Sequence, residues 1–338
     1  MTIVGVSPAS LTGGLSTALP WIVLGVGTAL ALGAGATLQY VSRRRVLAEH
    51  LAAENERLYR QQRRLAAELQ RSLLTAPPEP DHAEIVVRYL PAAEAAAVGG
   101  DWYDAFFQAN GATVLVIGDV AGHDIAAAAT MGQLRGLLRG IATSNDVGHA
   151  DVLTRLDTSM ALLDVRTLAT AAAARLEQST DDRQRGFTRL RWSNAGHPPP
   201  LVLQPDGSVV ELAPSRAELL LGVDPAATRS ESVLTLDRGA TVLLYTDGLI
   251  ERRDADLDAG LTRLQTVLAE LAELVDRPLQ ELCDALLERL VNGRPDDDVA
   301  LVAVRLHRQD QPRPAEAGPR RLPASIPDET GARPPHES

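Results

Sequence analysis

The sequence predicts an α+β fold, an antiparallel sandwich of strands and helices that follows a membrane-spanning helix and a linker helix. Within residues 82–307, short apolar runs are joined by polar turns, and the amphipathic helical segments are grouped apart from them. This order favours antiparallel sheets over a doubly wound parallel sheet. Upstream, a long uncharged segment is followed by a densely charged segment that contains no Gly or Pro.

The composition limits the classes of function. Hydrophobic residues make up 45% of the 338 residues but aromatic residues only 3%, so the core must consist mainly of Ala, Leu and Val. A formal net charge of -11 argues against non-specific nucleic-acid binding, which needs a basic surface. The single cysteine, Cys283, excludes an intramolecular disulfide framework and a cysteine-rich zinc site. We expect Cys283 to be a buried, inert thiol on an amphipathic helix.

The N-terminal region predicts a membrane anchor. Residues 1–42 carry no charged side chain, and residues 19–41 are long and apolar enough to cross a hydrocarbon core of roughly 30 Å as a helix. Trp21 and Tyr40 stand near its two ends, and three arginines follow at 43–45. The positive-inside rule then puts residues 1–18 outside the cell and the rest of the chain in the cytoplasm of a single-pass cell-membrane protein. A cleaved signal peptide is the alternative, disfavoured by the missing basic n-region and the length of the apolar stretch.

A linker helix is predicted over residues 43–76. Leu51, Leu58 and Leu65 recur every seven residues, which places Asn55 at a core position of a heptad repeat. An Asn at that position favours a parallel homodimer in a fixed register. The alternative is a single solvated helix, and in either case Pro77 and Pro78 end it.

The globular region contains alternating strand and helix patterns. Strands are expected at residues 84–90, 113–117, 169–177, 187–193, 201–203, 209–212, 241–245 and 299–306. Helices are expected at residues 125–141, 151–163, 261–274 and 279–290. Residues 308–338 are rich in proline and charge, which predicts a disordered tail.

Four acidic sites adjoin the ends of these strands. They are Asp101, Asp119, Asp247 and the run 296–298. Ordinary Asp-bearing turns could explain any one of them. One sheet edge could gather all four, and such a cluster stays ionised only when cations neutralise it. Oxygen ligands favour Mg²⁺ or Mn²⁺ over zinc, and two such ions can activate a water and clamp a phosphoryl group.

Five motifs occur in an order that resembles a known family. They are residues 99–104 (GGDWYD), 118–123 (GDVAGH), 194–200 (NAGHPPP), 245–251 (YTDGLIE) and 297–299 (DDV). Together they resemble the SpoIIE-type branch of the metal-dependent protein serine/threonine phosphatases, the PPM or type 2C family. The resemblance covers residues from about 70 to 307.

This resemblance implies a fold and a set of metal ligands. The fold is an αββα sandwich, two antiparallel sheets flanked by helices, with two divalent cations, Mn²⁺ or Mg²⁺, at one end. Asp119 and Asp101 form the catalytic core of the implied site. The resemblance makes Asp119 the bridge between both ions with the Val120 carbonyl nearby, Asp101 a ligand of one ion, and Asp247 and Asp297 ligands of the other. The resemblance leaves Asp298 as the alternative to Asp297 for this last ligand.

The resemblance also implies a substrate, a protein carrying phosphoserine or phosphothreonine. In this branch that protein is often an anti-sigma-factor antagonist, so the enzyme controls transcription. Two alternatives stay open: a catalytically silent scaffold that binds a phosphoprotein, and a dimetal hydrolase of small phosphoesters. The complete set of acidic positions argues against the scaffold, and the order of the motifs alone disfavours the small-substrate enzyme.

Residues beside the acidic set have two interpretations each. His123 could contact the phosphate or donate a proton, but packing at a helix start is the favoured interpretation, with Asp124 as a cap of the helix that follows. Asp104 could orient a metal-bound water or make a structural hydrogen bond. Asn194 and His197 are expected to hold their proline-rich turn rather than to bind metal.

Two arginines on the helix predicted at 125–141 are candidates for binding a phosphate. Arg135 and Arg139 lie one turn apart and could meet a phosphate. A solvated helix face is the favoured interpretation.

Overall fold

A computed structural model describes residues 12–73, 75–80, 82–91, 99–122, 124–143, 148–214, 217–252, 256–274, 276–291, 293, 295 and 297–307. The predicted tail at 308–338 and most of the predicted outer segment at 1–18 lie outside these residues. The chain separates into two compact units, residues 1–61 and residues 62–338.

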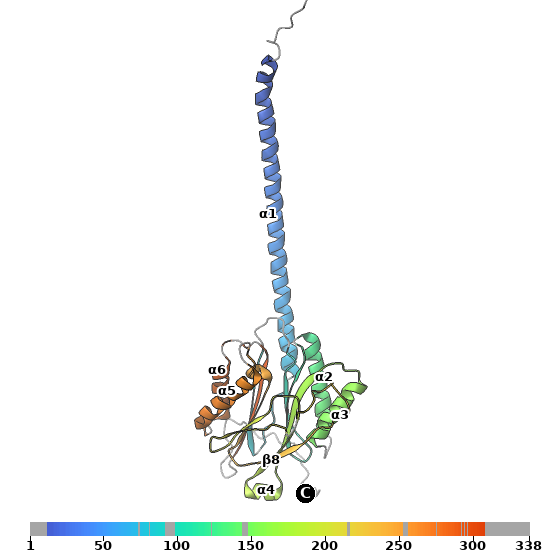
Figure 1. Ribbon diagram of the computed structural model, residues 1–338, viewed down its shortest axis with the longest axis vertical. Coiled ribbons are helices and arrows are strands. Elements are labelled where there is room, and N and C mark those ends of the chain that lie inside the picture. The colour runs from blue at the N-terminus through green and yellow to red at the C-terminus, as the bar shows by residue number, and fades with distance from the viewer. Residues whose placement is uncertain are drawn as a thin grey trace, which may run out of the picture. The chain divides into compact units, whose positions relative to one another are not determined.

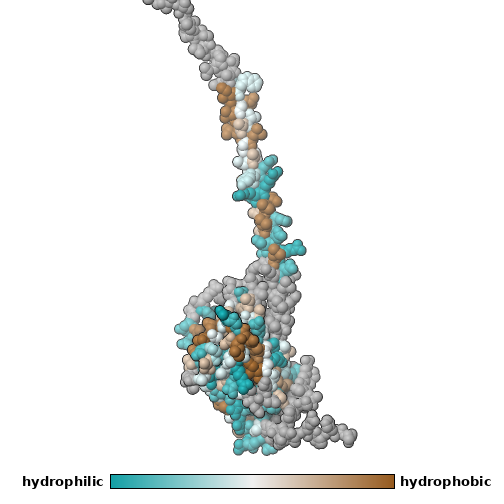
Figure 2. Space-filling model, turned by 90° about the vertical axis from the view of Figure 1, so that its right-hand side faces the viewer, coloured by the Kyte–Doolittle hydropathy of each residue, from teal (hydrophilic) through white to brown (hydrophobic). Residues whose placement is uncertain are grey.

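One helix, α1 (Thr12–Leu73), covers both the predicted membrane span and most of the predicted linker. It includes Pro20 and ends four residues before Pro77. Among the described residues, α1 holds the one stretch that is long and apolar enough to cross a membrane. Its apolar side chains are exposed, and Figure 2 shows brown and white residues along this stretch and teal ones in the charged part that follows. Leu51 and Leu58 of the proposed heptad seam are also about half exposed.

The second unit is built around two five-stranded antiparallel sheets (Figure 1). The first sheet has the order β1 (Ala83–Leu90), β10 (Val299–Leu306), β9 (Thr241–Tyr245), β6 (Leu201–Leu203) and β7 (Val209–Glu211). The second has the order β2 (Trp102–Phe107), β3 (Thr113–Val120), β4 (Ala169–Glu177), β5 (Thr188–Ala195) and β8 (Ser232–Leu236).

Helices cover the outer face of each sheet (Figure 1). The second sheet packs against α2 (Ile125–Ala142) and α3 (His149–Leu162). The first packs against α5 (Leu257–Glu270), the short η3 (Leu271–Leu274) and α6 (Leu279–Leu290). The remaining short helices are α4 (Thr180–Arg185) and η2 (Asp247–Leu249). The predicted αββα sandwich is therefore confirmed.

The layering explains why the central strands are continuous apolar runs. In β3, Leu115 and Ile117 face the core between the sheets, whereas Val114 and Val116 face α2 and α3. Side chains alternate between the two faces of a strand, and here both faces are buried. Cys283 is buried in α6, where burial raises the pKa of its thiol to about 12, as expected of an inert cysteine.

The sequence patterns miss four elements, of which the three-residue η2 is the shortest. Strand β2 is missed because Asp104 interrupts its apolar run, although that side chain is fully buried. Strand β8 is an edge strand whose exposed Val233 gives no clean alternation. Helix α4 is a six-residue helix inside the segment predicted as a polar turn. The helix expected at 261–274 begins earlier, at Leu257, because Asp256 caps it by accepting from the Ala259 amide (2.8 Å).

Candidate metal centre

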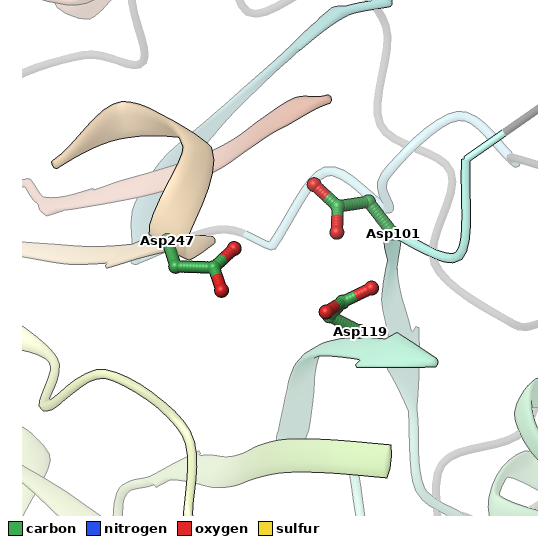
Figure 3. A group of neighbouring side chains, drawn as sticks. All are labelled: Asp101, Asp119 and Asp247. Atoms are coloured by element: carbon green, nitrogen blue, oxygen red, sulfur yellow. The ribbon is translucent and has the colours of Figure 1, made fainter. Parts of the chain in front are cut away.

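Three carboxylates from separate parts of the sequence meet at one end of the sandwich. Asp101 directly precedes β2, Asp119 is the next-to-last residue of β3, and Asp247 begins η2 just after β9. Each contributes a carboxylate oxygen, and these oxygens all lie within 4.8 Å of one another. Figure 3 shows the three side chains directed into one shared space. Both sheets contribute, since β2 and β3 belong to the second sheet and β9 to the first.

Glycines allow the backbone to come this close. A Cβ on Gly100 would lie 2.1 Å from the Val120 carbonyl oxygen and 2.9 Å from the Asp119 carboxylate. The Val120 amide also donates to the Gly100 carbonyl (3.2 Å). Only glycine permits this approach, so the glycines before Asp101 set its carboxylate against the end of β3.

The electrostatics of the group favour protonation in the absence of cations. Burial raises the pKa of Asp119 to about 7, with a further contribution from the charge of Asp247. Burial, then the charge of Asp119, raises the pKa of Asp101 well above its usual range. Burial and the charge of Asp297 raise the pKa of Asp247. The three carboxylates therefore need compensating positive charge to be ionised together at neutral pH.

These shifts predict how the stability of the chelator-treated chain depends on pH. Between pH 8 and about 6.5 the folded state takes up protons at Asp119 that the unfolded state, with an ordinary carboxyl pKa, does not. Stability therefore rises as the pH falls through this window. We expect a higher unfolding temperature at pH 6.5 than at pH 8. Saturating Mn²⁺ should remove the difference, and scanning calorimetry in both conditions measures it.

The window stops at pH 6.5 because two histidines act in the opposite direction. Burial lowers the pKa of His149 and His197 to about 3, so below pH 6.5 the unfolded state takes up protons that the folded state excludes. The Asp119→Asn variant is the matched control, since it should show a weaker increase between pH 8 and 6.5. An equal increase in that variant would contradict the assignment.

The donor set fits hard divalent cations. The Oδ2 atom of Asp101 is buried, and no described residue forms a hydrogen bond with it. The Val120 carbonyl lies beside Gly100 at the edge of the same group. Carboxylate and carbonyl oxygens without nitrogen or sulfur ligands favour Mg²⁺ or Mn²⁺.

The two remaining acidic candidates occupy different environments. Asp297 is exposed and lies outside the group of three, although its charge raises the pKa of both Asp119 and Asp247. Asp298 is buried and accepts a hydrogen bond from the Tyr89 hydroxyl (2.8 Å). Of this pair, Asp297 is thus the one open to a cation in solvent.

Two threonines with no predicted role lie beside the carboxylates. The buried Thr246 hydroxyl accepts from the Ala300 amide (2.9 Å) in the first sheet and hydrogen-bonds Asp101 at the edge of the second. Thr170 lies opposite Asp119 in the register of β3 and β4. Neither hydroxyl could be recognised from the sequence, because a threonine next to an acidic turn, like Thr246, is common and Thr170 has no acidic neighbour in the chain.

His197 and Asn194 have the structural role that was predicted. The Asn194 side chain accepts from the His197 amide (2.7 Å) and donates to the His197 carbonyl (2.8 Å). The imidazole of His197 donates from Nε2 to the Tyr245 carbonyl (3.1 Å), so its Nδ1 accepts from the Thr170 hydroxyl (2.8 Å). The neutral ring thereby bridges the two sheets close to the carboxylates.

The prediction of a solvated arginine face is wrong. Arg135 Nη2 lies 3.2 Å from Asp104 Oδ1, and Arg139 Nη1 lies 3.0 Å from the same oxygen. The Arg135 side chain is only 11% exposed. Asp104 also accepts from the Thr75 hydroxyl (3.3 Å) and is not one of the three clustered carboxylates. The structure supports the structural role predicted for Asp104. Side chains alternate along β2, so the Asp104 carboxylate points toward the face that α2 covers.

The Asp119 turn leads into α2. Asp124 caps this helix as expected, accepting from the Ala127 amide (2.8 Å). Gly122 has a φ of 113°, a conformation that favours glycine. His123 lies outside the described residues, so its predicted packing role stays a prediction.

Comparison with known proteins identifies a family that the chain matches. The family described as Stage II sporulation protein E (SpoIIE) matches residues 109–307. Protein IcfG of Synechocystis sp. is 27% identical in a 234-residue alignment that covers 62% of this chain and 36% of IcfG. This chain therefore spans about a third of the length of that relative.

Solved structures show the same architecture. The crystal structure of the RsbU and RsbW domains of Rv1364c from Mycobacterium tuberculosis matches with a TM-score of 0.60 and 33% identity, over 71% of this chain and 64% of that one. The PP2C phosphatase domain of SpoIIE from Bacillus subtilis matches with a TM-score of 0.54 over 67% of this chain and 63% of that structure. Its identity is 17%, which supports the fold alone.

Proposed function

Because the chain belongs to the SpoIIE family, we propose that it is a metal-dependent protein phosphatase that hydrolyses phosphoserine or phosphothreonine. The observation that carries this proposal is the meeting of Asp101, Asp119 and Asp247 within 4.8 Å at one end of an αββα sandwich. A catalytically silent scaffold would need no such set of mutually repelling carboxylates, of which Asp101 is buried and the other two are partly buried, since clustering them has an energetic cost.

The chemistry assigns each carboxylate a role. Two bound divalent cations, Mn²⁺ or Mg²⁺, would supply a water of lowered pKa and positive charge for the phosphoryl group. Asp119, within 4.8 Å of both other carboxylates, would bridge the cations, with the Val120 carbonyl beside it. Asp101 would hold one cation, and Asp247 with Asp297 would hold the other. Thr246 would keep the Asp101 carboxylate oriented through its hydrogen bond.

We further propose that the substrate is a phosphorylated anti-sigma-factor antagonist, so that the enzyme controls transcription. The support is the 33% identity to a structure that contains RsbU and RsbW domains. The substrate protein itself is not identified by the site, because the carboxylates recognise the phosphoryl group and the cations rather than the protein that carries them.

A paired substrate assay tests this function. Purified chain with Mn²⁺ should release phosphate from a phosphoserine-containing antagonist protein with a kcat/KM at least tenfold above that for p-nitrophenyl phosphate. The same antagonist lacking phosphate serves as the binding control. Equal turnover of both substrates would support a small-phosphoester hydrolase, and binding without turnover would support a scaffold.

The location and assembly of the chain are also proposals. The apolar stretch of α1 would anchor the protein in the cell membrane with the phosphatase domain in the cytoplasm. The exposed Leu51 and Leu58 would form the seam of a parallel homodimer. In isolated membranes treated with a thiol oxidant, a Leu51→Cys variant should then form a disulfide-linked dimer, while Ala53→Cys, on the opposite side of the heptad, should not. Cys283 is buried and would not interfere.

A further inference from the structure

Asp298 lies between two turns of the metal centre, the one that carries Asp101 and the one that carries Asp247. A Cβ on Gly99 would lie 1.2 Å from the Asp298 Oδ2 atom, and a Cβ on Gly248 would lie 2.1 Å from the Asp298 carbonyl oxygen. Gly99 belongs to the turn that carries Asp101, and Gly248 directly follows Asp247. The side chain of Asp298 therefore fills the space against one turn while its backbone fills the space against the other.

The position of Asp298 also affects its neighbour. The Asp298 amide donates to the Asp297 carboxylate (2.7 Å), so the backbone at Asp298 orients the exposed ligand candidate. The Asp298 carboxyl is buried and turned toward Gly99. A shift of Asp298 would thus move three elements at once: the Asp101 turn, the Asp247 turn and the Asp297 side chain.

A side chain from the neighbouring sheet strand β1 helps to hold Asp298 in this place. The Tyr89 hydroxyl, from β1, donates to the Asp298 Oδ2 atom at 2.8 Å. Its oxygen would also lie 2.8 Å from a Cβ on Gly99, so the hydroxyl, the carboxylate and the glycine are packed together. Burial, then the charge of Asp298, raises the pKa of Tyr89, which keeps the hydroxyl protonated as a donor.

We propose that Tyr89 is a positioning residue of the metal centre and that Asp298 is its partner rather than a metal ligand. The hydroxyl fixes Asp298, and Asp298 sets the spacing between the carboxylates of the two sheets. This inference rests on the proposed function, because it assumes that the carboxylates bind divalent cations. Partners that orient metal ligands typically contribute about 10- to 100-fold to metal affinity.

The test is Mn²⁺ binding to the full chain in detergent, measured by titration calorimetry, with the Tyr89→Phe variant. This change removes only the hydroxyl. The matched control is Tyr245→Phe, which removes another hydroxyl of low exposure, one that donates to the Pro199 carbonyl at 2.9 Å. We expect a rise in the Mn²⁺ dissociation constant of about tenfold in Tyr89→Phe and of less than about twofold in Tyr245→Phe, with similar unfolding temperatures for the two metal-free variants.

A double variant separates positioning from a general structural effect. In an Asp298→Ala background, Tyr89→Phe should cause no further loss of Mn²⁺ affinity, because the group that it positions is gone. Unchanged affinity in Tyr89→Phe, an equal loss in Tyr245→Phe, or independent losses in the double variant would each overturn the inference. A wild-type chain that binds no Mn²⁺ would overturn the proposed function as well. Binding with no phosphatase activity would overturn only the proposed function.

Discussion

Replacing Asp119 by Asn is expected to lower phosphoester hydrolysis by on the order of 10³-fold, while the protein still folds. Charge stabilisation by bound metal is worth several kcal/mol, and each 1.36 kcal/mol changes a rate about tenfold. Asp119 lies within reach of both other carboxylates, and its charge is among the causes that raise the pKa of Asp101. The amide retains the shape of the side chain but removes the charge that would hold the cations.

Steady-state hydrolysis of a phosphoserine protein with saturating Mn²⁺ measures this effect. The matched control is Asp206→Asn, an exposed turn residue that accepts from the Ser208 amide (2.9 Å) and should leave activity within about twofold. The metal-free Asp119→Asn chain should be more stable than wild type at pH 8, because one of the repelling charges is gone. Activity that stays within tenfold of wild type would contradict the metal-bridging role.

Replacing Asp157 by Ala is expected to destabilise the phosphatase domain by about 3–5 kcal/mol, the usual result of leaving a buried charge unpaired. Asp157 of α3 pairs with Arg229, and both side chains are fully buried. The same carboxylate accepts from the Gly222 amide (2.7 Å), and Arg229 donates to the Leu219 carbonyl (2.8 Å). The pair thus ties the segment between β7 and β8 to α3, and its loss would leave a guanidinium without its counter-charge.

Thermal unfolding measures this second effect, and a fall of about 10 °C is expected for a domain of this size. Arg166→Ala is the matched control. Arg166 pairs with Asp164 at 2.7 Å, but the two side chains are 85% and 71% exposed. Exposed pairs contribute only about 0–1 kcal/mol. Similar falls in the unfolding temperature of the two variants would show that burial does not determine how much the Asp157–Arg229 pair contributes to stability.

Strands buried on both faces and one amphipathic helix were predicted closely. Strands β4, β9 and β10 and helix α6 have the predicted bounds, because continuous apolar runs and helical spacing indicate buried elements directly. Strand β2 was missed because Asp104 is a buried charge whose partners, Arg135 and Arg139, come from a helix further along the chain. The same long-range pairing made the prediction of a solvated arginine face wrong.

The sequence by itself determined the order of motifs, the all-oxygen donor set and the positions of the acidic residues at strand ends, because these are local properties. Only the tertiary structure decided which carboxylates meet. It brought Asp101 and Asp119 of one sheet to Asp247 of the other, turned Asp298 toward Tyr89, and placed Thr246 and His197 between the sheets. These contacts depend on how the two sheets pack face to face. That packing is set by side chains far apart in the sequence, and no single segment carries it.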